Sequence, residues 1–284
     1  MKHILVLPTS LRTKLTEAIA DESICDRWNE IGLDSVDGIL NKIIEDLNSK
    51  YKSLSIVSIR EETPMEIKEK IKNTGNMSKF AGYFENEDGY VDALFFYIPP
   101  NSKNANDFIS MKIMPSIFGV FNGINDQTKD RHINCMPVFI VSLCTTSRVN
   151  NASVKKQIIC CETLGFYYHD LFGNSYHDVI GKFDNDGNEI TKIQTLNELD
   201  ELLGGIDNKW FNVDNDNKVL KVLSSTIESS TNVTSDMYRL SLFVIPAIYK
   251  ATLDNYSVDI DSISDVTGDT AETFRMFVKK IVGG

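Results

Sequence analysis

The sequence lacks any long apolar run. Its longest apolar stretches, around residues 93–98 and 240–248, are far shorter than the roughly 18 residues that cross a bilayer. The N-terminal segment 1–8 has no long apolar region and no small-residue cleavage site, so it indicates a first strand rather than a signal peptide. We therefore expect no membrane partner.

Cysteine is scarce and irregularly spaced. An odd number of cysteines without regular spacing argues against a secreted disulfide scaffold and favours a reducing cytoplasm. The spacing of these residues relative to His132 is not that of a zinc finger or ribbon. The five cysteines are Cys25, Cys135, Cys144, Cys160 and Cys161.

Several nucleotide and hydrolase motifs are also missing. The chain has no Walker loop, no dinucleotide-binding glycine motif, no Gly-x-Ser-x-Gly and no kinase signature. These absences argue against a nucleotide-driven enzyme and a serine hydrolase. The formal charge of −11 argues against a protein whose whole surface binds the phosphate backbone of a nucleic acid. It is compatible with a local basic patch.

The 284 residues, 42% hydrophobic and 24% charged, predict a packed globular protein. The order of elements predicts an α/β or α+β fold: a mixed sheet with flanking helices, plus a small helical C-terminal domain. We expect an α/β domain at 1–223, a linker at 224–235 and a helical domain at 236–284.

The clearest elements are an amphipathic helix at 36–50 capped by Ser35 and buried strands at 90–98 and 137–143. We also expect Thr9 or Ser10 to cap a helix at 11–21, and Thr195 and Glu198 to form a capping box. The other predicted elements are strands at 3–7, 54–59, 80–84 and 165–172 and helices at 64–72, 154–164, 195–203 and 236–255.

The segment 257–281 combines the signals of two short helices joined by a turn. Asp259 can cap the first helix, Gly268 can form the turn, and Asp269 or Thr270 can cap the second. The segment resembles the helix-turn-helix of winged-helix regulators, which implies DNA contact through Arg275, Lys279 and Lys280. The second helix nevertheless begins with acidic residues, and a helical hairpin that packs or self-associates is the alternative.

A second resemblance lies in the middle of the chain. Asp92 lies in the strand 90–98, and the strand 137–143 continues through Ser142 towards a basic stretch. This arrangement resembles the restriction-endonuclease-like core, in which an Asp and a following carboxylate bind Mg²⁺ and a Lys assists the attacking water. The resemblance implies that Asp92 binds Mg²⁺ and that Ser142 stands at the second carboxylate position.

The same resemblance places Cys144 where the catalytic Lys is expected. A thiol carries no fixed positive charge, so the cation would come from Arg148, Lys155 or Lys156, with Arg148 also contacting nucleic acid. The alternative is that both strands are ordinary core strands. His169 with Asp170 and His177 with Asp178 form two His-Asp pairs that indicate either a catalytic role or, as the more common alternative, exposed loop histidines.

Two functional hypotheses follow. The first is a nucleic-acid-associated protein that docks DNA through its C-terminal helices; if it is an enzyme, it is a Mg²⁺-dependent nuclease. The second is a non-catalytic assembly protein whose C-terminal helices bind a protein partner or a second copy.

Overall fold

The computed structural model divides the chain into two compact units. Unit one comprises Met1–Val154 and Phe166–Val179, and unit two comprises Lys155–Gly165 and Ile180–Gly284. In the described residues, no helix is both long and apolar enough to span a membrane. The structure describes residues 1–71, 79–102, 137–145, 158–160, 162, 166–172, 193–205, 208, 210–223, 243–244 and 246–259.

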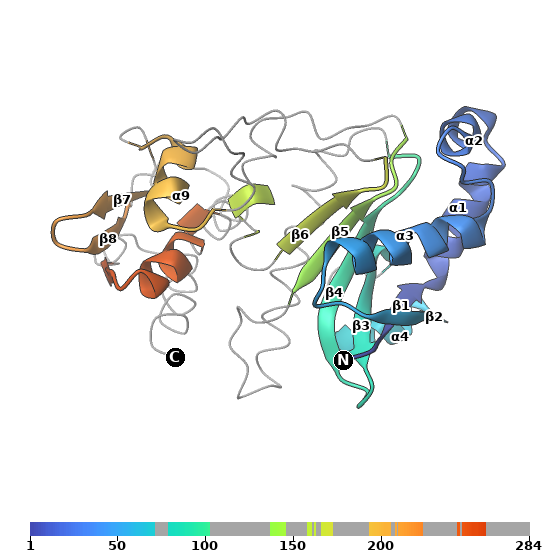
Figure 1. Cartoon of the computed structure of the whole chain (residues 1–284), viewed down its shortest axis with the longest axis horizontal. Helices are drawn as coiled ribbons and strands as arrows, with labels where there is room; N and C mark the ends of the chain where they lie inside the picture. The colour runs from blue at the N-terminus through green and yellow to red at the C-terminus, as the bar shows by residue number, and fades with distance from the viewer. Residues whose placement is uncertain are drawn as a thin grey trace. The chain divides into compact units, whose positions relative to one another are not determined.

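Unit one is built on a six-stranded sheet with the order β2-β1-β3-β4-β5-β6 (Figure 1). β3 runs antiparallel to both of its neighbours, and every other pair is parallel. The other five strands therefore end at one edge of the sheet, which we call the carboxyl edge. The strands are β1 (His3–Pro8), β2 (Ile56–Glu62), β3 (Ala81–Asn86), β4 (Val91–Ile98), β5 (Val138–Ser142) and β6 (Phe166–Asp170).

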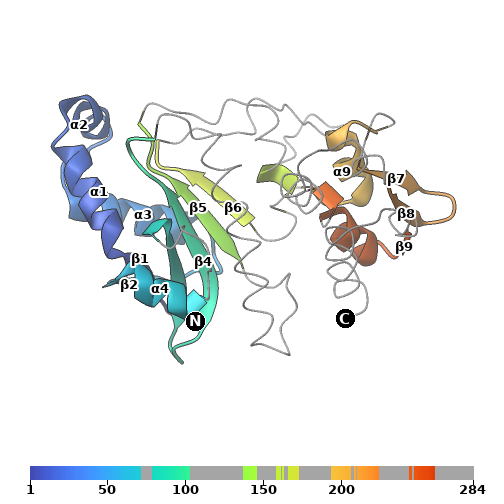
Figure 2. The same ribbon diagram turned by 180° about the vertical axis from the view of Figure 1, so that it is seen from behind.

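Helices cover both faces of this sheet (Figures 1 and 2). α1 (Thr9–Ile19) and α3 (Val36–Lys50) pack on one face, in a core shared with α2 (Glu22–Asn29), and α4 (Pro64–Ile71) lies on the other. The predicted Ser35 cap of α3 is confirmed, because its hydroxyl accepts a bond from the Gly38 amide at 3.2 Å. Buried residues at helical spacing give α3 its apolar face: Ile39, Leu40, Ile43 and Leu47.

The expected α/β class, with a mixed sheet and flanking helices, is confirmed. The predicted start of α1 needs correction. Thr9 is already helical, Pro8 is the N-cap residue, and no side chain caps this terminus. The sequence reading also missed α2, whose Asp21 cap accepts a bond from the Ser23 amide.

Unit two contains a short helix and a three-stranded sheet. The predicted capping box of Thr195 and Glu198 is confirmed at the start of α9 (Leu196–Leu203). β7 (Phe211–Asp214) pairs antiparallel with β8 (Val219–Val222), and β8 pairs in parallel with β9 (Ser257–Asp259). Residues 246–253 are helical.

The β8–β9 pair links residues on either side of the expected domain boundary at 223. The division at 1–223, 224–235 and 236–284 therefore does not coincide with the two units. β9 ends at Asp259, so the helix that Asp259 is predicted to cap would begin outside the described residues. The rest of that motif, 260–281, and the linker 224–235 lie outside the described residues.

Candidate functional site

The sheet register separates the two residues that the nuclease resemblance pairs. Ser142, at the carboxyl end of β5, lies beside Ile98 of β4. Asp92 precedes Ile98 by six residues along the same strand, which places it about 20 Å away at the rise of an extended chain. The expected shared metal centre of Asp92 and Ser142 is therefore wrong, because the two residues lie at opposite ends of the sheet.

Asp92, near the amino end of β4, contacts two buried neighbours. Its Oδ1 accepts a bond from the Asn86 side-chain amide at 3.1 Å, and its Oδ2 lies 3.4 Å from Nε2 of His3. His3 and Asn86 are both buried. A carboxylate engaged in this way holds the strand ends together, since buried polar groups need partners.

Ser142 instead lies beside a different carboxylate. It is in register with Asp170 of β6, and directly paired residues of neighbouring strands project to the same face. Both are buried, and the pair Ile140 and Tyr168 lies two residues before them on that face. Asp170 Oδ1 accepts a bond from the Phe172 amide at 2.9 Å, which fixes the carboxylate at the carboxyl edge.

Cys144 follows two residues after Ser142 and is also buried. Its Sγ donates to the Pro99 carbonyl at 3.2 Å. The pKa of the thiol is raised to about 11, chiefly by burial and to a smaller extent by the charge of Asp170. The thiol is therefore neutral at pH 7 and does not replace the lysine cation of the nuclease resemblance.

Hydroxyl groups complete this cluster. The Thr145 hydroxyl is buried and makes no hydrogen bond among the described residues. Desolvation raises the pKa of buried Tyr168, and the charge of Asp170 adds to that effect. We call Ser142, Cys144, Thr145, Tyr168 and Asp170 the Ser142 cluster.

The carboxyl edge continues towards β1 with further hydroxyls. Ser10 and Tyr97 both donate to the Lys79 carbonyl, at 2.6 and 2.9 Å, and burial raises the pKa of Tyr97 to about 12. The α1 helix begins at this edge, with no side-chain cap and no acidic residue in its first turn. Such a terminus presents unpaired amide donors and the positive end of the helix dipole.

His169 does not act with its sequence neighbour Asp170. It alternates with Asp170 along β6 and therefore faces the α3 side of the sheet, where Nε2 lies 3.0 Å from Asp46 Oδ2. Asp46 also accepts a bond from Lys42 at 2.5 Å. Burial lowers the pKa of His169 despite the bond to Asp46, which favours the neutral imidazole.

No described group of three or more His, Cys, Asp or Glu side chains could hold a metal ion. Six predicted site residues lie outside the part of the chain that the structure describes. They are Arg148, Lys155, Lys156, Arg275, Lys279 and Lys280.

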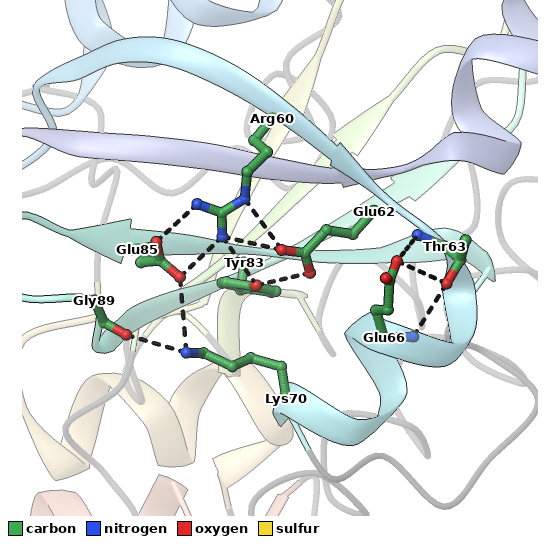
Figure 3. Close-up of polar contacts among 8 residues, drawn as sticks. All are labelled: Arg60, Glu62, Thr63, Glu66, Lys70, Tyr83, Glu85 and Gly89. Atoms are coloured by element: carbon green, nitrogen blue, oxygen red, sulfur yellow. Dashed lines mark hydrogen bonds and ion pairs between the residues drawn. The ribbon is translucent and has the colours of Figure 1, made fainter.

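The sequence reading missed a second polar cluster, which joins β2, β3 and α4 (Figure 3). Arg60 makes a two-pronged pair with Glu85, with both nitrogen–oxygen distances at 2.9 Å. Arg60 also bonds Glu62 at 3.1 Å, and the Tyr83 hydroxyl donates to Glu62 at 2.9 Å. Lys70 of α4 lies 3.7 Å from Glu85. We call these five residues the Arg60 cluster.

Strand register explains why the Arg60 cluster forms. Arg60 and Tyr83 both pair with Val6 of the intervening β1, so all three residues project to the same face. The bond from Arg60 is the main cause that lowers the pKa of Glu85, whereas burial is the main cause that raises the pKa of Tyr83. The only signal for this cluster in the sequence was that Arg60 and Glu62 alternate along one strand. Glu85, the partner of Arg60, lies 25 residues after it, so the sequence alone did not reveal the pair.

Comparisons with known proteins found no relative of this chain. No family model matches the chain, and neither the curated proteins nor the solved structures gave a significant match.

Proposed function

We propose that this chain is a nucleic-acid-associated protein with a Mg²⁺-dependent phosphodiester site at its carboxyl edge. Asp170, rather than Asp92, is the metal ligand in this proposal. The observation that carries it is the placement of Ser142 and Asp170 side by side, both buried, where parallel strands end. Open α/β sheets bind their ligands at this edge.

The residues of the Ser142 cluster fit Mg²⁺ better than a softer metal. Mg²⁺ prefers oxygen ligands and is commonly held by one or two carboxylates together with water and substrate phosphates. Asp170 offers a carboxylate, and Ser142 and Thr145 offer hydroxyl oxygens. A bound Mg²⁺ would supply positive charge to a phosphate, and Asp170 would fix the position of that charge.

Two further features support a phosphate ligand. The uncapped N-terminus of α1 lies at the same edge, and helix N-termini favour anions. Along the sequence, Arg148, Lys155 and Lys156 lie between Thr145 and Tyr168, and in this proposal they pair with phosphate oxygens. In the same proposal, Arg275, Lys279 and Lys280 make the DNA contacts of the C-terminal segment.

The test compares two aspartate variants, Asp170→Asn and Asp92→Asn, in binding and cleavage of DNA and RNA with and without Mg²⁺. We expect Asp170→Asn to abolish the Mg²⁺-dependent component, because it removes the ligand charge. Asp92→Asn should keep this component once the assay is normalised to folded protein. Equal loss in both variants, or no Mg²⁺-dependent binding or cleavage by the wild type, would sink the proposal.

The same proposal places the protein in a reducing cytoplasm. This is supported by Cys25, Cys144 and Cys160, which are free thiols in the described part of the chain.

A non-catalytic assembly function is the second candidate. It is favoured by β2, the last strand at one end of the sheet order, whose Val57 side chain is 56% exposed. Exposed edge strands can pair with another chain. Light scattering on Val57→Lys tests this role: loss of an oligomer formed by the wild type supports it, and a monomeric wild type contradicts it.

A further inference from the structure

The Arg60 cluster forms the floor of an open cavity of about 400 Å³ between the sheet and α4. The cavity lies in unit one, and its wall comes from one side of α4. Its lining residues are Arg60, Glu62, Glu66, Glu69, Lys70, Tyr83 and Glu85. The volume is large enough for a small organic molecule or a long side chain.

The charged side chains on the floor of this cavity are already paired with one another. Arg60 is paired with Glu62 and Glu85, and Lys70 donates to the Gly89 carbonyl at 3.1 Å and lies near Glu85 (Figure 3). These two cations and two carboxylates compensate one another. The floor therefore offers little free charge of either sign to a ligand.

The α4 wall is different, because its carboxylates keep unused acceptors. Glu66 accepts both bonds from Thr63 on one oxygen, Oε2, at 2.7 and 2.8 Å. Glu69 makes no ion pair or hydrogen bond among the described residues. Glu66 and Glu69 are three residues apart, so they lie on neighbouring positions of one helix face. The seven lining side chains together carry a formal charge of −2.

The acidic and basic side chains that line the cavity exclude some classes of ligand. A dianion would face this net negative charge and find Arg60 and Lys70 already paired. A metal ion needs several ligands at short range, and here Glu62 and Glu85 are already paired with Arg60. A hydrogen-bonding organic cation satisfies both the charge and the size of the cavity.

We propose that this cavity binds an ammonium or guanidinium group carried on a flexible chain. The cation lies between Glu69 and the free oxygen of Glu66, above the paired floor. A free polyamine and a basic side chain of a peptide share this chemistry. The inference is independent of the phosphodiester site.

The test is calorimetric titration of the full chain at low ionic strength with agmatine, with spermidine and with a short peptide containing one arginine. The variant is Glu69→Gln, and Glu45→Gln is its matched control. Glu45 is an exposed glutamate of α3, on the opposite face of the sheet. Added salt should weaken any binding, because the contact is ionic.

We expect Glu69→Gln to weaken binding about fivefold, the upper range for one partly exposed ion pair, while Glu45→Gln leaves it unchanged. Binding of spermidine alone identifies a polyamine site, and binding of the peptide alone identifies a side-chain site. The proposal fails if none of the three probes binds. It also fails if the two variants weaken binding equally, since the attraction would then be a general effect of the chain's negative charge.

Discussion

The Arg60 cluster and the Ser142 cluster lie in the same sheet but stabilise their polar groups differently. In the first, opposite charges meet, and Glu85 stays ionised because Arg60 bonds both of its oxygens. In the second, burial raises the pKa of Cys144 and Tyr168, so both side chains stay protonated. Glu85 is thus matched with an opposite charge, whereas Cys144 and Tyr168 are kept neutral.

This difference also separates the roles that we propose. The Arg60 cluster needs no added ion, because its cations and carboxylates already compensate one another. The Ser142 cluster presents a carboxylate and hydroxyls, and its thiol is neutral. Its chemistry is therefore suited to a hard cation supplied from solution.

The largest expected effect comes from separating β1 from β3. Gly82 of β3 precedes Tyr83 of the Arg60 cluster, and a Cβ at this position would meet the Val6 carbonyl oxygen at 2.2 Å. Gly82→Ala should therefore force β1 and β3 apart and lower the free energy of unfolding by about 3 kcal/mol. Urea denaturation followed by circular dichroism measures the loss.

The control for this substitution is Gly32→Ala. Gly32 has a φ of 77° but open space around its Cβ position, so only backbone strain of about 1 kcal/mol is expected there. Equal losses in the two variants would show that crowding against β1 is not the cause at Gly82.

A smaller effect is expected from breaking the Arg60 cluster alone. Arg60→Met leaves the carboxylate of Glu85, which is only 12% exposed, without its main partner. We expect a loss of about 2 kcal/mol, in the range for hydrogen bonds to charged groups. Arg27→Met removes an exposed pair with Glu30 on α2 and should cost less than about 1 kcal/mol.

The acid limb of the stability curve adds a second measurement on these variants. Arg60 lowers the pKa of Glu85 in the folded state, so this pair stabilises the fold above the ordinary carboxyl range and loses its effect as the pH falls through the lowered pKa. Arg60→Met should flatten that limb. A slope identical to that of the wild type would contradict the pairing.

The smallest effect concerns reactivity rather than stability. Because burial raises the pKa of the Cys144 thiol to about 11, very little thiolate is present at neutral pH. Iodoacetamide should therefore label Cys144 much more slowly than the partly exposed Cys25, as measured by mass spectrometry of the labelled peptides. Equal labelling rates in folded protein would show that the Ser142 cluster is open to solvent.

Local signals in the sequence predicted most of the described elements. The Ser35 cap with the apolar spacing of 36–50 defined α3, and the Thr195–Glu198 capping box defined α9. The aromatic and branched residues of 91–98 defined β4. Each of these signals depends on residues a few positions apart, which is why they could be recognised without tertiary information.

The candidate site depends on contacts that the sequence does not display. Asp170 meets Ser142 only because β6 pairs with β5 in one register, and a shift by one residue would bring His169 to that place instead. The pairing of Arg60 with Glu85 likewise crosses an intervening strand. The strand Ser257–Asp259 was not predicted from the sequence, because it forms only by pairing with β8.

The reversed direction of β3 also has a consequence for how the sheet assembles. β3 and β4 are joined by a short turn around residues 87–90, so their pairing closes a small loop. The parallel pairs β1–β2 and β4–β5 instead join segments that lie about forty residues or more apart, and closing such loops costs more chain entropy. We therefore expect the hairpin to form first on the folding pathway, as a template on which the parallel strands are later added.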